Sequence, residues 1–432
     1  MHILKIIHGY PQEYNAGSEV YTQSIVEELS KTNKVSLFTR IENEYMPDFE
    51  ILKTIINKNF SKYQVNIPRG KDGYRHKTLD LNFESLLLTL KPDVAHIGHL
   101  NHLSTGIIDI LKKHNIPIIY TLHDFWLMCP RGQFLQVGFG KETPFTLCEK
   151  QNDEQCALNC YNRYFSGTGD YFYEDLNYWK NWINRRMKET KSICNKTDFF
   201  IAPSKYLMNR FINDFEIPQE KIRYLDYGFP THYLDASKRK KNTTEYTFGY
   251  IGTHIPSKGL NLLIEAFSQI NENVKLKIFG RTIGQTTKTL RELAKNCTNE
   301  IEFLGEYNNK NLVSEVFSEV DVIVIPSIWG ENSPLVIHEA QACEVPVITA
   351  DFGGMREYVS HLENGLLFKH RNADALSKQM QFAIENQDLM RELGERAYLY
   401  SEDQKVPSID THCIELENIY SKVSEYSHCQ TL

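Results

Sequence analysis

The stretch from Pro326 to Leu367, PSIWGENSPLVIHEAQACEVPVITADFGGMREYVSHLENGLL, decides the fold of the second half of the chain. The apolar run Asp321 to Pro326 leads into it, and a second apolar run, Val345 to Thr349, follows a segment with helical spacing. A buried strand, a helix and another buried strand in this order predict a parallel α/β unit with a right-handed crossover.

A loop and the start of a helix lie between these two strands. Ser333 is a good N-cap and Pro334 suits the first helical position, which places Glu331 on the loop and Glu339 about one and a half turns inside the helix. A helix N-terminus at the carboxyl edge of a parallel strand offers N–H groups and the positive end of the helix dipole to a phosphate. The glycines of Asp351 to Met355 let backbone amides approach an anion, and Glu339 can accept both hydroxyls of a ribose. The pattern predicts a nucleotide diphosphate site.

Further strand patterns extend on both sides of this stretch and alternate with helical spacing. They predict two Rossmann-like, doubly wound α/β domains that face a central cleft. The strand patterns are His2 to His8, Val35 to Thr39, Asp93 to Ile97, Ile116 to Leu122, Asp198 to Ala202, Thr247 to Ile251, Lys275 to Phe279 and Ile301 to Leu304.

A chain of 432 residues exceeds the roughly 250 to 300 residues at which one core stops growing, so at least two domains are expected. The polar, aperiodic stretch Lys238 to Glu245 is the best linker candidate. We therefore predict an N-terminal domain over 1–237, with a cysteine-containing insertion at about 129–160, and a C-terminal domain over 238–407. A terminal helix over 408–432 is expected to pack back towards the N-terminal domain.

Composition excludes several classes of protein. The 48 Lys and Arg against 55 Asp and Glu give a net charge of −7, which argues against a nucleic-acid binder. No apolar run approaches the 18 or so residues of a membrane span, and Ile3 to Ile7 is too short for a signal-peptide core and is interrupted by Lys5. Nine cysteines, an odd number, fit a secreted disulfide framework poorly. We expect a cytoplasmic protein, with the inner face of the membrane as an alternative.

Several motifs together resemble one family. They are the glutamates Glu331 and Glu339 separated by seven residues, Ile251-Gly252 through Lys258-Gly259, Phe279-Gly280-Arg281, Gly17-Ser18-Glu19, and Thr121-Leu122-His123-Asp124 with Cys129-Pro130-Arg131. In this order they resemble the retaining glycosyltransferases of the GT-B fold, family 4 (glycosyl transferases group 1). The resemblance implies that the protein moves a hexose-type sugar from a nucleotide diphosphate donor to a hydroxyl of a glycan or glycolipid acceptor, plausibly in cell-surface polysaccharide synthesis.

The resemblance also assigns roles to matching residues. Lys258 would hold the donor diphosphate, with Arg281 as a second candidate, and Glu339 would bind the ribose. Glu331 and the amides of Asn332 and Ser333 would contact the donor sugar, Gly17 would approach the donor phosphate, and His123 would lie beside the transferred sugar. The expected catalytic residues are therefore His123, Glu331 and Lys258. Since no two aspartates lie two residues apart, a metal-binding Asp-x-Asp motif is absent and no cofactor is expected for catalysis.

Three positions depart from the family pattern. Thr253 stands where an Arg is common, so neutralisation of the diphosphate depends on Lys258 or on another cation. Glu344 stands where a helix-ending Gly is usual, and left-handed backbone there would cost roughly 1 to 2 kcal/mol. Ala16-Gly17 replaces a glycine pair.

Other features leave alternatives open. Cys129, Cys148, Cys156 and Cys160 could bind a structural zinc ion or remain free thiols, and only Cys156 and Cys160 have a common ligand spacing. His96, His99 and His102 are not expected to share a metal. The aromatic and basic segment Tyr161 to Arg186 is either a helical cover of the sheet or a site for acceptor or membrane, and the basic region Lys53 to Lys77 is a second candidate for membrane contact. The rival functions are a GT-B epimerase or phosphorylase and a non-catalytic nucleotide-sugar-binding scaffold.

Overall fold

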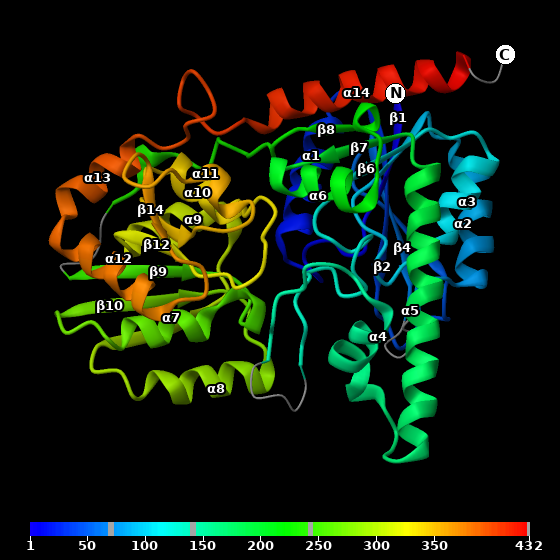
Figure 1. Cartoon of the computed structure of the whole chain (residues 1–432). Helices are drawn as coiled ribbons and strands as arrows, with labels where there is room; N and C mark the ends of the chain where they lie inside the picture. Colours follow the sequence, from blue (N-terminus) through cyan, green and yellow to red (C-terminus); the bar gives the residue numbers. More distant parts are fainter. Residues whose placement is uncertain (68–72, 139–143, 241–244, 430–432) are drawn as a thin grey trace. The chain divides into compact units, whose positions relative to one another are not determined.

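The computed structural model describes residues 1–67, 73–138, 144–240 and 245–429, and side chains up to residue 425. The chain divides into two compact units (Figure 1). Unit 1 consists of Met1–Gly228 together with Ile409–Leu432, and unit 2 consists of Phe229–Ser408. Parts of the predicted linker, of the cysteine-containing insertion and of the basic region, including Arg69 and Lys71, lie outside the described residues. No helix of the described chain is long and apolar enough to cross a membrane.

The division between the units differs from the predicted boundary at 237 and 238. Phe229 donates its backbone N–H to the carbonyl of Pro407 at 2.8 Å. The Arg239 guanidinium donates to the carbonyls of Phe317 and Val320, both at 3.0 Å. These bonds attach the segment after Gly228 to unit 2, although its sequence has no strand or helix pattern. The polar composition near residue 240 therefore did not mark the boundary.

Unit 1 contains an eight-stranded sheet in the order β3-β4-β2-β1-β5-β6-β7-β8. All pairs are parallel except β3 with β4. The strands are β1 (His2–Ile6), β2 (Lys34–Ile41), β3 (Ile51–Ile55), β4 (Phe60–Asn66), β5 (Val94–Ile97), β6 (Ile118–Thr121), β7 (Phe199–Ala202) and β8 (Ile222–Tyr224). The helices are α1 (Gly17–Leu29), α2 (Lys77–Leu90), α3 (Gly106–Lys113), α4 (Asp153–Cys156), α5 (Asp170–Lys196), α6 (Lys205–Phe215) and α14 (Ile409–Cys429).

The core of unit 1 is the middle of this sheet. Every residue of β1, β5 and β6 is buried, as expected for parallel strands covered on both faces. The terminal helix α14 packs against α1 and belongs to unit 1 (Figure 1). Lys5, in the middle of β1, is only 1% exposed, and among the described residues its amino group has no hydrogen-bond partner. Burial lowers the pKa of Lys5 well below its usual range, because a charged amine is disfavoured away from water.

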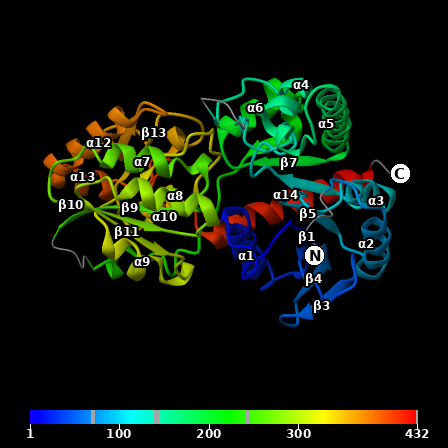
Figure 2. The same ribbon diagram turned by 90° about the horizontal axis from the view of Figure 1, so that it is seen from below.

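Unit 2 contains a six-stranded, fully parallel sheet in the order β11-β10-β9-β12-β13-β14. Figure 2 labels β9, β10, β11 and β13 of this sheet. The strands are β9 (Tyr246–Ile251), β10 (Val274–Phe279), β11 (Glu300–Gly305), β12 (Val322–Ile325), β13 (Val347–Ala350) and β14 (Gly365–Phe368). The helices are α7 (Leu260–Phe267), α8 (Gly284–Ala294), α9 (Leu312–Glu315), α10 (Leu335–Ala342), α11 (Met355–Tyr358), α12 (Ala373–Glu385) and α13 (Gln387–Glu395). The prediction of two doubly wound α/β domains is confirmed. In unit 2 the strand order reverses direction at β9, and ligands of such sheets bind beyond the carboxyl ends of the strands at that point.

Two local details of unit 2 correct or confirm the sequence analysis. Helix α10 begins at Leu335 with Pro334 as its N-cap, one residue later than predicted from Ser333 and Pro334, because Pro334 has an extended ψ of 117°. Glu344, just beyond the end of α10, has a φ of 54°. The backbone is therefore left-handed at the position where the family usually carries glycine.

Candidate functional site

Three loops meet beyond the carboxyl ends of β9 and β12. The Ile328 amide donates to the carbonyl of Ser257 at 2.9 Å, and the Gly354 amide donates to the carbonyl of Glu331 at 2.8 Å. These bonds connect the loop after β12 to the loop after β9 and to the loop after β13. The three segments that the sequence analysis selected in unit 2 therefore form one continuous surface.

Glycine is required where these loops touch. Gly259 has a φ of 71°, and a Cβ there would lie 1.9 Å from the carbonyl oxygen of Pro326. A Cβ on Gly354 would lie 1.4 Å from the carbonyl oxygen of Asn332. Any larger residue would push the loops apart, so both glycines serve close backbone packing. The backbone of the loop from Pro326 to Pro334 is thereby held at the start of α10.

Lys258 and Glu331 are in direct contact. The Lys258 Nζ lies 2.7 Å from Glu331 Oε1, which also accepts hydrogen bonds from Ser327 Oγ at 2.6 Å and Trp329 Nε1 at 2.8 Å. Glu331 is 5% exposed, whereas a third of the Lys258 side chain is accessible. Three donors on one oxygen stabilise the carboxylate and fix its orientation. The accessible side chain of Lys258 can bind an anion through its ammonium group.

Glu339 lies in α10, on the same helix whose N-terminus follows Ser333. Burial raises the pKa of Glu339 to about 7, against which the nearby His338 acts weakly. Tyr307 is close enough that Glu339 contributes, after burial, to raising the pKa of its phenol. A partly buried carboxyl that is about half ionised near neutrality can accept hydrogen bonds from vicinal hydroxyls above that pH. Asn332 and Ser333 are buried at the beginning of this helix.

Arginine side chains near the loops could supply positive charge that Thr253, in place of the usual arginine, does not. Arg281 follows β10, its carbonyl accepts the His254 amide at 3.0 Å, and its Nε is buried with no hydrogen-bond partner among the described residues. Arg371, which sequence reasoning missed, donates to the carbonyl of Ile328 at 3.4 Å. It lies three residues beyond β14, where no local pattern distinguished it from other surface arginines. Unit 2 thus offers Lys258, Arg281 and Arg371 around these loops.

His123 of unit 1 lies directly after β6. Its Nδ1 is 2.6 Å from the hydroxyl of Tyr227, and the two rings are stacked at 5.7 Å. Burial, and then the buried Lys5, lower the pKa of His123 well below its usual range. The imidazole is therefore neutral, and its bond to Tyr227 holds the orientation of the ring.

Tyr227 belongs to a buried aromatic group that reaches α14. Its ring lies 4.5 Å from the ring of Tyr21, whose hydroxyl is 2.7 Å from Nε2 of His412. His96, one of three histidines considered above, bonds Thr121 Oγ1 at 2.7 Å and the Tyr420 hydroxyl at 2.6 Å. Local spacing could not predict the contacts with α14, because these partners lie 324 and 391 positions away along the chain.

Gly17 is the first residue of α1, and Ala16 is its N-cap with an extended backbone (φ −132°, ψ 174°). Any residue adopts this conformation, so the methyl of Ala16 is accommodated. Glu19, two residues on, lies 3.2 Å from Nε2 of His8. Burial alone would raise the pKa of Glu19, but the bonds from His8 and Ser18 lower it to about 2.

The four insertion cysteines of unit 1 form no disulfide bond in the described part of the chain. Burial raises the pKa of Cys148 to about 11 and that of Cys156 to about 12, with smaller contributions from the neighbouring cysteines. Across the described parts of the chain, no three His, Cys, Asp or Glu side chains are arranged to hold a metal ion. A structural zinc at Cys129, Cys148, Cys156 and Cys160 stays a prediction.

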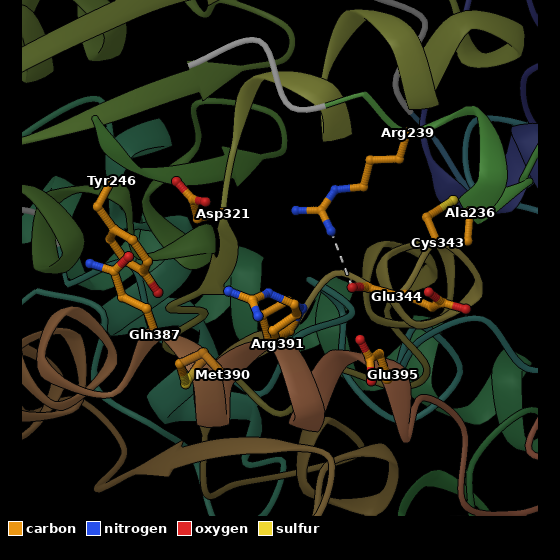
Figure 3. A pocket seen from close by; sticks show the side chains of 11 residues that line it. Ala236, Arg239, Tyr246, Asp321, Cys343, Glu344, Gln387, Met390, Arg391 and Glu395 are labelled. Atoms are coloured by element: carbon orange, nitrogen blue, oxygen red, sulfur yellow. Dashed lines mark hydrogen bonds between the residues drawn. The ribbon is translucent and has the colours of Figure 1, made fainter. Parts of the chain in front are cut away.

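A cavity of about 330 Å³ lies at the other edge of the unit 2 sheet (Figure 3). Tyr246 is the first residue of β9, and Asp321 and Pro346 directly precede β12 and β13, so the cavity adjoins the amino ends of the strands. The Arg239 guanidinium, at its wall, donates to the carbonyl of Glu344 at 3.3 Å. The site built around Lys258 is at the opposite, carboxyl edge and does not include this cavity.

Known proteins resemble the chain over both units. The family model described as Glycosyltransferase Family 4 matches residues 16–232, and the model described as Glycosyl transferases group 1 matches residues 234–400. An uncharacterized glycosyltransferase of Methanocaldococcus jannaschii is 32% identical over 37% of this chain and 44% of its own length. The capsular polysaccharide biosynthesis glycosyltransferase CapM of Staphylococcus aureus is 26% identical over 51% of this chain and 60% of its own length. The chain thus spans about half the length of the curated relatives it matches.

Solved structures share the fold. Sucrose-phosphate synthase from Thermosynechococcus elongatus superposes with a TM-score of 0.71 at 17% identity, covering 98% of both chains. HepE of Anabaena in complex with UDP-glucose gives a TM-score of 0.67 at 16% identity, covering 98% of this chain and all of that one. At these identities the likeness shows the fold, which is GT-B.

Proposed function

The chain belongs to glycosyltransferase family 4, and from this premise we propose that it transfers a sugar from a nucleotide diphosphate donor to a hydroxyl acceptor with retention of configuration. The observation that carries the proposal is the contact of Lys258 with Glu331 on loops packed through Gly259 and Gly354, directly before the helix that holds Glu339. Because HepE was solved in complex with UDP-glucose, this compound is the first candidate donor.

When the bond between the donor sugar and the diphosphate breaks, the diphosphate leaves with negative charge that must be neutralised. Fixed positive groups aimed at developing charge are the main catalytic lever in such sites, and one donor is worth on the order of 3 kcal/mol. We assign this work to Lys258, with Arg281 as support, and to the first amides of α10. Glu339 binds the ribose hydroxyls, and Glu331 with the backbone at Asn332 and Ser333 contacts the donor sugar.

The chemistry proposed for transfer needs no protein nucleophile. The acceptor hydroxyl attacks the anomeric carbon on the face from which the diphosphate leaves, so the C–O bond to phosphate breaks as the new glycosidic bond forms. The acceptor proton passes to the leaving diphosphate. His123, held neutral by its buried surroundings, and Gly17 are the residues that unit 1 contributes in this proposal.

The proposed acceptor is a glycan or a glycolipid that is extended during the synthesis of a cell-surface polysaccharide. Two relatives support this class by name, CapM of Staphylococcus aureus and a monoacylated phosphatidylinositol monomannoside mannosyltransferase of Corynebacterium glutamicum. The second of these is GDP-mannose-dependent, which adds guanosine donors to the compounds that a screen must contain.

The test is incubation of the full chain with UDP, GDP, ADP and dTDP sugars, with release of nucleoside diphosphate as the readout. Release with one donor is expected, and Lys258→Ala should lower it by on the order of 100-fold at unchanged folding. The matched control is Lys295→Ala, an exposed lysine elsewhere in unit 2 that pairs only with Glu292 in its own segment. Binding without release would favour a scaffold, and a requirement for free phosphate would favour a phosphorylase.

A further inference from the structure

Unit 1 carries an accessible cluster of aromatic rings that the proposed donor and catalytic residues do not use. Tyr164 stacks on Trp179 at 5.1 Å, Tyr161 contacts both Trp179 at 5.0 Å and Trp182 at 5.5 Å, and Tyr178 meets Trp179 edge to face at 5.4 Å. We call these five residues the aromatic surface. They come from the short π and 3-10 helices before α5, Ala157–Tyr161 and Asn162–Tyr164, and from the first half of α5, which extends past the neighbouring helices α2 and α3 (Figure 1).

Two rings of the aromatic surface are open to solvent, Tyr164 at 46% and Tyr178 at 57% exposed, whereas Tyr161, Trp179 and Trp182 are partly buried. Tyr171 and Tyr173, nearer the start of α5, are 67% and 65% exposed. Tyrosine and tryptophan side chains offer large contact areas, and fixing them in one conformation costs little entropy. They are therefore common where a ligand covers the ring. Four accessible tyrosines on one short segment indicate a binding surface rather than scattered exposure.

The charges around the rings are mixed rather than basic. Arg163 lies over the Tyr164 ring at 4.6 Å and Lys180 is paired with Glu154 at 3.0 Å, while the exposed Arg131 also acts on Tyr161. Asp170 and Glu174 add exposed negative charge on α5. Membranes rich in anionic lipid, nucleic acids and phosphorylated ligands would need a basic surface here.

Polar groups border the exposed ring of Tyr178. Glu174, Asn177 and Asn181 are exposed on α5 and lie four, one and three residues from Tyr178, so they share its side of the helix or adjoin it. Carboxylates and amides both exchange hydrogen bonds with hydroxyl groups. The electron-rich ring faces attract the weakly positive C–H groups of a sugar ring.

From these observations we propose that the aromatic surface binds neutral carbohydrate, as a subsite for acceptor sugars remote from the reacting hydroxyl. The assignment to the acceptor rests on the proposed function, whereas the binding of carbohydrate rests on the surface alone. A glycan chain would stack on the ring of Tyr178 and contact the exposed part of Tyr164, and its hydroxyls would bond to the amides and the carboxylate beside Tyr178.

Equilibrium titration of the full chain, followed by tryptophan fluorescence, tests this proposal, because Trp179 and Trp182 lie in the surface. The probes are neutral linear hexasaccharides of glucose, xylose, mannose and N-acetylglucosamine. Saturable binding of at least one probe is expected at dissociation constants of about 1 mM or below. Tyr164→Ala and Tyr178→Ala should each weaken it about tenfold, and Tyr45→Ala, which removes a 97% exposed tyrosine elsewhere in unit 1, should leave it unchanged.

Three results would overturn the proposal. They are no saturable change with any of the four probes, probe binding by the Tyr164 and Tyr178 variants as tight as that of wild type, or tyrosine-dependent binding of phosphatidylcholine or phosphatidylglycerol vesicles instead of the probes. Thermal shift with nucleotide sugars is measured on the same samples. It checks that the variants fold, and it separates the two proposals. Glycan binding without any nucleotide binding would end the proposed transferase function and leave the carbohydrate site standing.

Discussion

The ionisation of Glu339 should control donor binding. Its pKa is raised to about 7 by burial, so the carboxyl changes from mostly protonated to mostly ionised over the neutral range. The proposed ribose contact needs an acceptor for two hydroxyl protons, and a protonated carboxyl supplies that less well than a carboxylate. The perturbation is therefore a change of pH, together with the substitution Glu339→Gln, which removes the titration and keeps the shape.

The magnitude follows from the pKa. With a value of about 7, roughly a tenth of the wild-type carboxyl is ionised at about pH 6 and roughly nine tenths at about pH 8. If only the carboxylate form binds well, affinity for the donor should rise about tenfold between these two values. The same pKa makes a stability prediction of opposite direction. The folded protein holds the Glu339 proton more tightly than the unfolded chain, in which the pKa is 4.5. The protonated carboxyl therefore stabilises the fold by up to about 3 kcal/mol relative to alkaline pH. This stabilisation is complete below about pH 4.5 and is lost as the pH rises through about 7.

The assay is isothermal titration with UDP-glucose, or with whichever nucleotide sugar binds in the screen. A nucleotide sugar is preferred to the free diphosphate because its phosphates carry no proton that titrates near neutrality. Wild type is expected to bind about tenfold more tightly at the higher pH, while Glu339→Gln binds weakly and without pH dependence. An equal pH dependence in both proteins, or full affinity in Glu339→Gln, would refute the role given to Glu339.

Four further outcomes are expected. Gly354→Ala should weaken donor binding more than tenfold at retained circular dichroism, since its Cβ would lie 1.4 Å from the Asn332 carbonyl oxygen; unchanged affinity would contradict the packing of the loops. Tyr227→Phe should lower kcat about tenfold at unchanged donor KM, because it removes the 2.6 Å hydrogen bond between the Tyr227 hydroxyl and His123 Nδ1. An unaltered kcat would show that this hydrogen bond does not contribute to catalysis. Glu344→Gly should stabilise the protein by about 1 kcal/mol, or about 2 °C in calorimetry, as it relieves left-handed backbone; a lower Tm would count against this. Lys5→Met should raise the unfolding free energy in urea by about 1 to 3 kcal/mol, because a buried amine is replaced by a side chain of similar size, and destabilisation would mean that the amine is paired in solution.

Local spacing predicted much of unit 2. Alternation of apolar runs and helical segments predicted its doubly wound sheet, and the family resemblance selected Lys258, which the structure places in contact with Glu331 after a neighbouring strand. The contact arises because loops after neighbouring parallel strands share one edge, whatever their distance along the chain. The left-handed backbone at Glu344 was also predictable, since the position follows the end of a helix.

Contacts between distant segments were beyond such reasoning. No pattern near His123 indicates that Tyr227 bonds to it, or that Tyr21 brings His412 of α14 into the same group. Strand β3 was missed because it is a short edge strand without a buried residue, and β4 was missed because its buried apolar residues are separated by polar ones, so the region was interpreted only as a basic surface. The division after Gly228 differs from the predicted boundary because the segment that follows it has no strand or helix pattern and is joined to unit 2 by the backbone bond of Phe229 to Pro407.

Hydrogen–deuterium exchange of the full chain with and without a nucleotide sugar tests the central claim most directly. Binding of the donor at the carboxyl edge of the unit 2 sheet predicts slower exchange in three segments together, residues 252–259, 328–339 and 352–356. Residues around the cavity at the amino edge, such as 387–395, should exchange unchanged. Protection confined to that edge, or no protection with any nucleotide sugar that shifts the melting temperature, would contradict the site and with it the proposed function.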